Sequence, residues 1–550
     1  MLANALLALA AASGAEAAKL GSRDTKTPTS TTPNSEAVWF TPVPEIYAGA
    51  AVTGPPAMLA QINPGPFRAQ FDPSNPLQTS QPIAGAAGRN IFQHMGPFSP
   101  YFVPEDGFGV DEYPLPEGSE FKQVYLVHRH GSRYPSDEED ANSFAHKIAN
   151  VTAQGVKFSG DLDFLNDLVP DDGLDALVAK GRQELFESGV QHYYNYGGLL
   201  DKGSSHKLVV RSTSVDRAYK SAENFLAGMF GLDWKDNADI LTVITANGFN
   251  NSLSGSGICP HAAENFATLN KPAMVEWQNK YLKERTEQLR SLAGGYNWTI
   301  ADSYNAQTMC AYQTITAGYS KFCDLFNWNE WEGYGYSNTI MSSSLAGFAS
   351  PCGRALGAAW VAEFIARVQG HLPDIAPGTT TANITQDSSP VAFPLDQGMY
   401  LDFGHDISIW GVIMGFGFRQ FAEFLPASGP TPGLKLDVAK ITPFAGRIAI
   451  EIIEAPHAVN PVRGCEGSEG VYDTTTGNTS YVHVILNQRT VPLHASFPEC
   501  AYRDDGWCEL STFLDVAKKN LDKAEYEWSC FGNWTIGAYG SITDGVAPKS

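Results

Sequence analysis

The chain has 550 residues and a formal net charge of −22 at pH 7, with 43% hydrophobic and 17% charged residues. This composition is ordinary for a globular protein, and the length suits one large domain with insertions or two domains. The negative charge argues against nucleic-acid binding, because phosphate backbones require basic surfaces. No segment after the N-terminal apolar run is long and apolar enough for a bilayer, so we expect no membrane association.

The N-terminal part predicts a secreted protein. Residues 1–18 resemble a signal peptide, with an apolar run over 2–12 and the small-residue triplet AEA at 15–17. Residues 19–85 are rich in Pro, Ser and Thr and predict an arm, whereas 86–550 predict the folded domain. Eight cysteines without a CxxC pair favour disulfides over zinc. Six glycosylation sequons support an extracellular or cell-wall location: Asn150, Asn250, Asn297, Asn383, Asn478 and Asn533.

The first strand is predicted at Phe121–Val127, a short β-branched and aromatic run. It leads into the loop RHGSRYP, in which Arg129 and Arg133 flank His130. Two guanidiniums around one imidazole suit an oxyanion such as phosphate. Gly131 lets the backbone approach that anion closely. We therefore expect an anion site at the C-terminal edge of this strand, where open α/β sheets bind ligands.

The next elements predict a second anion-favouring position. A helix is expected near 174–189 and a short strand at Lys207–Val210. Arg211 follows directly, before a helix over Val215–Phe230, so it is predicted where a strand meets a helix N-terminus. Arg217 lies one helical turn further and is interpreted as structural.

The second half of the chain predicts more helices and the remaining strands. An amphipathic helix is expected at Arg354–Val368. A third strand, Met399–Phe403, ends in Gly404, His405 and Asp406, just before a buried helix over Ile407–Gly415. Late strands are predicted at Ile448–Ile453 and Tyr481–Leu486. Together these elements predict an α/β sheet with a mostly helical insertion at 141–204 and 250–345.

Parallel strands would bring three strand ends together, with Arg129, His130 and Arg133 on one, Arg211 on another, and His405 with Asp406 on the third. That set fits phosphomonoester hydrolysis, which requires charge stabilisation, a nucleophile and an acid for the leaving oxygen. A GxSxG serine-hydrolase motif is absent.

Simpler interpretations stay open for each of these residues. Arg211 could form a structural salt bridge, His405 could be a hydrogen-bonded core histidine, and Asp406 could serve only as a helix N-cap. His128 and His130 form an HxH pair of the kind that binds metal, although the sequence offers no companion ligand cluster.

The motifs resemble those of the histidine acid phosphatases, branch 2 of the histidine phosphatase superfamily. RHGSRYP resembles the family signature RHGxRxP, and His405-Asp406 resembles its HD motif. Arg211, in VVRSTSVDRAYKSAENF, is similar to the family's third phosphate-binding arginine. The similarity runs from about Gly96 to the C-terminus and is greatest to secreted fungal phytases and acid phosphatases. It implies a phosphoglycerate-mutase-like α/β sandwich with a helical insertion.

The resemblance also implies roles and a substrate class. His130 would be the nucleophile that forms a phosphohistidine, and Asp406 would protonate the leaving group. Arg129, Arg133, Arg211 and His405 would bind the phosphoryl oxygens, with no metal and no cofactor. The partner would be a small phosphorylated substrate, plausibly phytate. A broad acid phosphatase, a mutase-like phosphotransferase, and a monomeric or oligomeric state all stay open.

The same resemblance implies disulfide pairs. Cys310–Cys323 and Cys259–Cys530 resemble bridges of the fungal phytases, and Cys500–Cys508 resembles a local bridge. Cys352 and Cys465 are then expected to form the fourth pair.

Overall fold

The computed structural model describes residues 85–86, 89–136, 140–170, 174–200, 206–265, 271–463 and 470–549. The predicted signal peptide and nearly all of the predicted arm lie outside the described residues. Among the helices that are described, none is both long and apolar enough to cross a bilayer.

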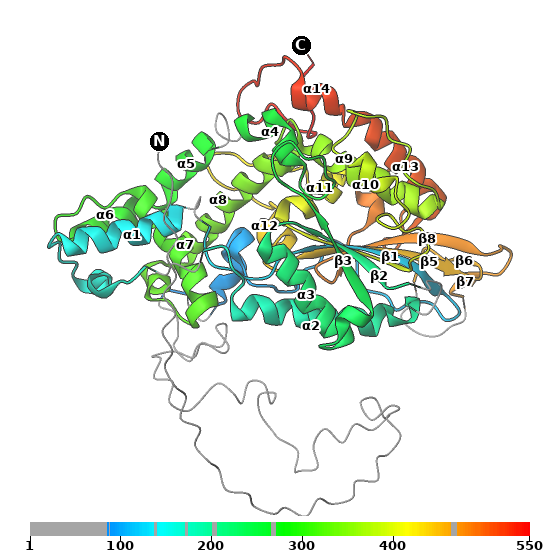
Figure 1. Cartoon of the computed structure of the whole chain (residues 1–550). Coiled ribbons are helices and arrows are strands. Elements are labelled where there is room, and N and C mark those ends of the chain that lie inside the picture. The colour runs from blue at the N-terminus through cyan, green and yellow to red at the C-terminus, as the bar shows by residue number, and fades with distance from the viewer. Residues whose placement is uncertain are drawn as a thin grey trace, which may run out of the picture. The chain divides into compact units, whose positions relative to one another are not determined.

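An eight-stranded mixed sheet lies at the centre (Figure 1). Its order is β10-β8-β5-β1-β4-β2-β3, and β9 pairs with β8. Strands β1, β4, β2 and β3 are parallel, whereas β5, β8 and β10 run antiparallel to their neighbours. The strands are β1 Glu120–Arg129, β2 Leu208–Thr213, β3 Ala238–Val243, β4 Met399–Gly404, β5 Arg447–Ala455, β8 Thr479–Leu486, β9 Arg489–Thr490 and β10 Cys508–Glu509, with a separate hairpin of β6 Ala458–Val459 and β7 Tyr472–Asp473.

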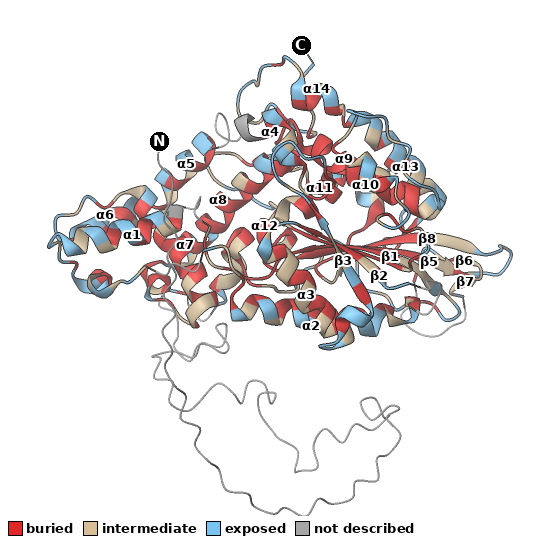
Figure 2. Cartoon of the chain, in the orientation of Figure 1, coloured by how far each residue is buried: buried red, intermediate tan, exposed pale blue. Residues whose placement is uncertain are grey.

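Helices cover both faces of this sheet (Figure 1). They are α1 Asp140–Ala153, α2 Ala179–Tyr196, α3 Asp216–Phe230, α4 Pro260–Asn265, α5 Lys271–Tyr281, α6 Lys283–Leu292, α7 Ile300–Ala317, α8 Trp328–Ala346, α9 Gly353–Gln369, α10 Ile384–Asp387, α11 Asp406–Phe416, α12 Val438–Ile441, α13 Leu510–Lys523 and α14 Tyr526–Phe531. Strand β4 and helices α9 and α11 are almost wholly buried (Figure 2).

The alternation of side chains along β1 explains the layers. Tyr125 and Val127 pack in the core formed with α9, α11 and α13, whereas Val124 and Leu126 pack in the core formed with α2 and α3. Successive strand residues point to opposite faces, so an apolar run of this kind requires cover on both sides. The predicted α/β sandwich is therefore confirmed.

A third core lies beside the sheet and joins α1 to α6, α7 and α8 through residues such as Phe144, Leu289, Tyr312 and Trp331. The range 141–204 divides between layers, because α1 joins this helical group whereas α2 packs on α3 against the sheet.

Three of the four expected disulfides are present: Cys259–Cys530, Cys310–Cys323 and Cys500–Cys508. The fourth expectation is wrong for Cys352, which is a buried free thiol. Its Sγ lies within 4.8 Å of the sulfur atoms of Cys259 and Cys530, in an apolar cluster with α14. Cys465 lies outside the described residues. Arg463, the last described residue before that segment, packs on Trp507.

Candidate active site

The loop after β1 is held by backbone bonds from three directions. Arg129 N donates to Gly446 O at 2.8 Å, and His130 N donates to Gly404 O at 3.0 Å. Ala445 N donates to His130 O at 2.9 Å. The histidine thus lies where parallel β1 and β4 end side by side, as the sequence predicts.

Close packing against α2 fixes the rest of the loop. A Cβ on Gly131 would lie 2.3 Å from the carbonyl oxygen of Gly181, so only glycine fits there. The buried Glu184 accepts bonds from Ser132 N at 2.9 Å and Ser132 Oγ at 3.1 Å. Burial raises the pKa of Glu184, and the bonds from Ser132 partly offset this. Glu184 therefore anchors the loop without facing the site.

His130 has the geometry of a nucleophile. Its Nδ1–H donates to Gly131 O at 2.9 Å, which leaves the lone pair on Nε2. No described residue hydrogen-bonds Nε2. Burial, followed by the charges of Arg129, Arg133 and Arg217, holds the pKa of His130 well below its ordinary value. The imidazole is therefore neutral at mildly acidic pH, as an attack on phosphorus requires.

Arg129 connects the nucleophile loop to the HD pair. Its Nη1 donates to Thr442 O at 2.7 Å and, at shorter range, to Pro97 O. Its Nη2 lies 3.6 Å from Asp406 Oδ2. The Nε of Arg129 is buried without a hydrogen-bond partner among the described residues. An unpaired buried donor next to a histidine is the kind of group that a phosphoryl oxygen would satisfy.

His405 and Asp406 lie beside His130, at the start of α11. The rings of His405 and His130 meet edge to face, with centroids 5.6 Å apart. The Nδ1 of His405 is buried, and no described residue bonds to it. Burial, then Arg217, lowers the pKa of His405 to about 3, so its ring is neutral. His405 can therefore donate one N–H to an oxyanion.

Asp406 is partly exposed, with 33% of its side chain accessible. Its Oδ1 accepts a bond from Ile407 N at 2.9 Å. Burial alone would raise its pKa, but Arg129 and then His405 bring the pKa below its ordinary value. These two neighbours therefore favour the carboxylate form of Asp406. A bound phosphate would counter the charge of Arg129 and move this pKa upward.

Arg211 does not reach this site, and its predicted role in phosphate binding is corrected. Strand β2 continues to Thr213, so Arg211 lies in mid-strand rather than at the strand end. Its Nε and Nη2 each donate to Asp402 at 2.7 Å, and Nη1 donates to Glu363 at 2.6 Å. These carboxylates raise the pKa of Arg211 well above its ordinary value despite burial. The open structural interpretation, a salt-bridge arginine, is the one that fits.

Arg217 lies in the first turn of α3, beyond the true end of β2, and takes the place expected of Arg211. Its charge lowers the pKa of both His130 and His405. Its Nη1 lies 3.1 Å from Asp175 Oδ1, and Arg133 Nη1 lies 3.9 Å from the same oxygen. One carboxylate thus bridges two arginines beside the nucleophile.

Arg133 is positioned by contacts outside its own motif. Its Nη1 donates to Tyr134 O at 2.8 Å and to Tyr312 Oη at 3.2 Å. Tyr312 belongs to α7, so the helical group beside the sheet contributes to the site. Sequence reasoning missed Asp175, Glu184 and Tyr312, because no local motif marks them. For Arg217 a signal existed, since the β-branched Thr213 favours a longer strand.

The first histidine of the HxH pair, His128, has a hydrogen-bond partner on each ring nitrogen. His128 Nδ1–H donates to Arg129 O at 2.7 Å, and Nε2 bonds to Ser188 Oγ at 2.9 Å on α2. Both nitrogens are therefore occupied by protein groups on the side of the sheet that faces α2.

The sheet, the histidine at the β1 edge and the arginines around it together define an α/β phosphatase that uses histidine. Comparison with known proteins gives the family. The model of the family "Histidine phosphatase superfamily (branch 2)" matches residues 120–487, and the chain belongs to this family. It is accordingly a histidine acid phosphatase that acts on phosphomonoesters.

Individual relatives are distant. Phytase A of Aspergillus fumigatus is 27% identical over 449 residues, covering 76% of this chain and 86% of the relative. The thiamine-repressible acid phosphatase pho4 of Schizosaccharomyces pombe is also 27% identical, over 451 residues, covering 77% and 86%. The crystal structure of the phytase from D. castellii has the same fold, with a TM-score of 0.63 at 22% identity, covering 82% of this chain and 89% of that one.

Proposed function

We propose that the enzyme hydrolyses phosphomonoesters through a phosphohistidine on His130, and that phytate is among its substrates. The observation that carries the mechanism is the free lone pair on the buried, neutral Nε2 of His130, which is surrounded by arginines. The proposal for phytate is supported by the similarity to several fungal enzymes named phytase A. The equal identity to an enzyme named acid phosphatase supports the broader alternative.

In the first step, Nε2 of His130 attacks phosphorus while the ester P–O bond breaks. Asp406 transfers its proton to the leaving alkoxide and becomes a carboxylate. In the second step, water attacks the phosphohistidine, and the P–N bond breaks with its electron pair returning to Nε2. Asp406 accepts the proton of that water, which releases inorganic phosphate and restores the enzyme.

Arg129, Arg133, Arg217 and His405 would hold the nonbridging oxygens throughout. Their positive charge and N–H groups stabilise charge on the phosphoryl group in the transition state. The groups that anchor this set are the backbone carbonyls around Arg129 and the hydroxyl of Tyr312 at Arg133. Such fixed donors need little reorganisation during reaction.

Three measurements test the proposal. His130→Ala should reduce turnover of an aryl phosphate to background. Circular dichroism at acidic pH should check that the variant is folded. Normal turnover by this variant would contradict the mechanism. Initial rates on phytate and on an aryl phosphate at acidic pH then separate a phytase from a broad phosphatase. Phosphate transfer to an added sugar acid in preference to water would instead indicate a phosphotransferase.

We also propose that the protein is secreted and glycosylated. Three disulfides are consistent with an oxidising compartment. Five of the six sequon asparagines are exposed, whereas Asn383 is half-buried and caps α10 by accepting a bond from Gln386 N. Endoglycosidase treatment of the protein from culture medium, followed by mass spectrometry, should locate glycans at exposed sequons rather than at Asn383.

A further inference from the structure

A cavity separate from the active site lies on the face of the sheet that α2 covers. It has a volume of about 300 Å³ and is lined by residues of α2, β5 and the β8–β9 turn, including Gln191, His192, Arg447 and Gln488, and by Glu112. A water molecule takes about 30 Å³ in the liquid, so the cavity can hold a small polyatomic ion with several waters.

Arg447 provides the positive charge in this cavity. The residue is only 5% exposed. Its guanidinium stacks on Tyr101 at 4.0 Å, Nη2 donates to Gln191 Oε1 at 2.7 Å, and Nη1 makes a long bond of 3.4 Å to Ala445 O. An arginine has five N–H donors, so most of them have no partner among the described residues.

The groups around Arg447 form a fixed and neutral ring. Gln191 Nε2 donates to Gln488 Oε1 at 2.7 Å, and Gln488 Nε2 donates to Tyr101 Oη at 2.8 Å. His192 is also neutral, because burial and then the charge of Arg447 lower its pKa to about 3. The ring orients the guanidinium without cancelling its charge.

Arg447 differs in this respect from most buried arginines of the described chain; Arg367, which lies over the rings of Phe393 and Tyr400, is the exception. Arg211, Arg354, Arg463 and Arg503 each pair with a carboxylate. Arg447 forms no ion pair with a described carboxylate. Burial lowers the pKa of Arg447, and the charge of Glu184, which forms no ion pair with it, offsets this only in part. An anion from solution would therefore stabilise the charged guanidinium.

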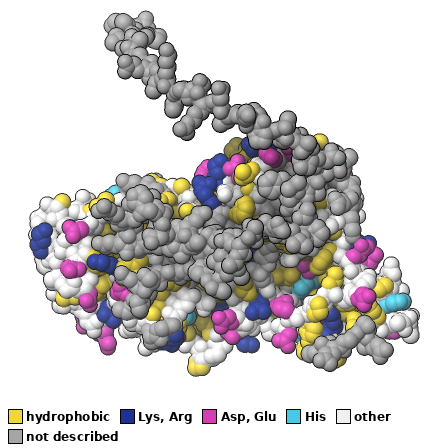
Figure 3. All heavy atoms as spheres, turned by 90° about the horizontal axis from the view of Figure 1, so that it is seen from below, with side chains coloured by type: hydrophobic (Ala, Val, Ile, Leu, Met, Phe, Trp, Pro, Cys, Tyr) yellow, Lys and Arg dark blue, Asp and Glu magenta, His cyan; other side chains and the backbone are white. Residues whose placement is uncertain are grey.

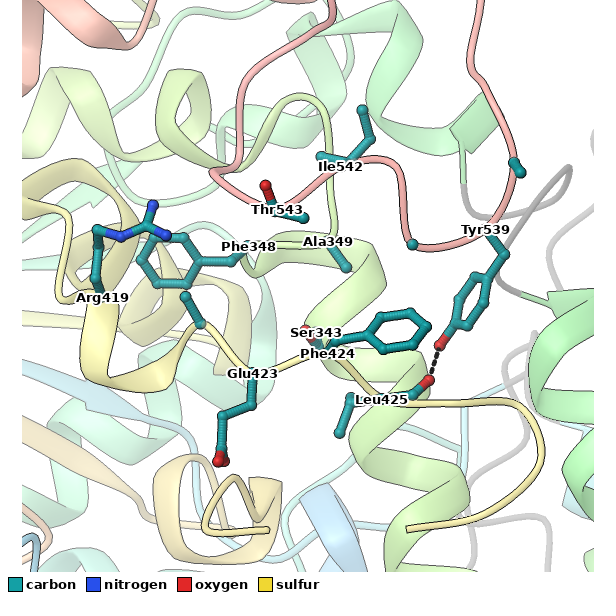
Figure 4. Close-up of a pocket in the computed structure, with 13 residues that line it drawn as sticks. Ser343, Phe348, Ala349, Arg419, Glu423, Phe424, Leu425, Tyr539, Ile542 and Thr543 are labelled. Atoms are coloured by element: carbon teal, nitrogen blue, oxygen red, sulfur yellow. Dashed lines mark hydrogen bonds between the residues drawn. The ribbon is translucent and has the colours of Figure 1, made fainter. Parts of the chain in front are cut away.

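Another pocket, drawn in Figure 4, lacks an unpaired charge of this kind. It measures about 110 Å³ and is lined largely by Phe348, Phe424 and other apolar groups, with Tyr539 Oη donating to Leu425 O at 2.7 Å. Its arginine, Arg419, pairs with Asp544. The visible face in Figure 3 shows acidic and basic side chains interspersed over the described surface, so surface charge does not single out another anion site there.

We propose that the Arg447 cavity binds a small tetrahedral oxyanion of the phosphate class, separately from the catalytic site. The guanidinium would bind the anion from one side, and the cavity leaves room for water on the other. Glu112 does not occupy Arg447, since its two oxygens accept bonds from Thr490 N at 2.8 Å and Thr490 Oγ1 at 2.6 Å. Its nearby charge would favour weak, exchangeable binding. The site does not depend on the proposed reaction.

Selenate is a suitable probe, because it is a tetrahedral dianion and selenium scatters anomalously. Crystals of the full chain, grown without phosphate or sulfate, would be soaked in selenate. We expect an anomalous peak within hydrogen-bond distance of the Arg447 guanidinium. Absence of that peak would overturn the inference, whatever is found at the catalytic site.

Two variants assign the peak. Arg447→Met should lose this peak while it hydrolyses an aryl phosphate within about twofold of the wild-type rate, as expected for a separate site. Arg217→Met should keep it. If Arg447→Met fails to fold, Gln191→Leu removes an orienting acceptor and should lower the peak height. A peak of unchanged height in the variant that folds would refute the assignment to Arg447.

Discussion

We assign a structural ion pair to Arg211 and phosphate binding to Arg217, the reverse of what the sequence predicts. One pair of substitutions tests this assignment. Arg211→Met leaves the side chains of Asp402 and Glu363 buried without their ion-pair partner, at 3% and 2% exposure, and among the described residues Asp402 keeps only its bond from Trp360 Nε1. Breaking a buried ion pair from one side typically costs about 3–5 kcal/mol of stability. We expect a loss of this size in the free energy of unfolding, with kcat/KM of the folded fraction close to that of the wild type.

Arg217→Met should behave in the opposite way. Arg217 is near the surface of the site and pairs with the half-exposed Asp175, so the free energy of unfolding should change by less than about 1 kcal/mol. Loss of one charged hydrogen-bond donor to the phosphoryl group removes about 1.5–3 kcal/mol of transition-state stabilisation. Since a factor of ten corresponds to about 1.4 kcal/mol, kcat/KM should fall by about 10- to 150-fold.

The assay combines urea unfolding, followed by intrinsic fluorescence, with initial rates on an aryl phosphate. The lysine variants of both positions serve as charge-conserving controls. Lysine at 211 should recover part of the stability, and lysine at 217 part of kcat/KM. The reasoning would be refuted if Arg211→Met, after correction for the folded fraction, lowered kcat/KM more than Arg217→Met.

Two further predictions concern the acid and the bridging carboxylate. Asp406→Asn should lower kcat/KM for alkyl phosphates by a factor of about 10²–10⁴. The loss should be much smaller for an aryl phosphate, whose leaving group is acidic. Equal losses on both substrates would exclude Asp406 as the acid. Because Arg129 and His405 hold the pKa of Asp406 below its ordinary value, its protonated fraction grows as pH falls, so the wild-type rate on alkyl phosphates should rise toward acidic pH and this rise should vanish in Asp406→Asn. Asp175→Asn removes a half-exposed carboxylate that competes with substrate for Arg133 and Arg217, and KM should fall by up to about fivefold at low salt; a higher KM would show instead that Asp175 orients the arginines.

Much of the fold could be predicted because its signals are local. The β-branched and aromatic run at β1, the amphipathic pattern of α9 and the buried α11 after His405 each depend on contiguous residues. The loop around His130 was predictable for the same reason, since its two arginines and its glycine lie within five positions. Parallel β1 and β4 then bring His130 and His405 together, because parallel strands end at the same edge.

By itself, the sequence determined five of the eight sheet strands, namely β1, β2, β4, β5 and β8, together with the loop around His130 and the HD pair. Only the tertiary structure decided which arginine faces the site. Arg211 and its partner Asp402 are 191 residues apart, and their contact depends on the register of β2 against β4. The same holds for Arg447, whose unpaired charge depends on which residues of α2 and the β8–β9 turn lie around it. A side chain's type is local information, but its partner is set by packing between distant segments, and that packing decides whether an arginine binds a ligand or a carboxylate of its own chain.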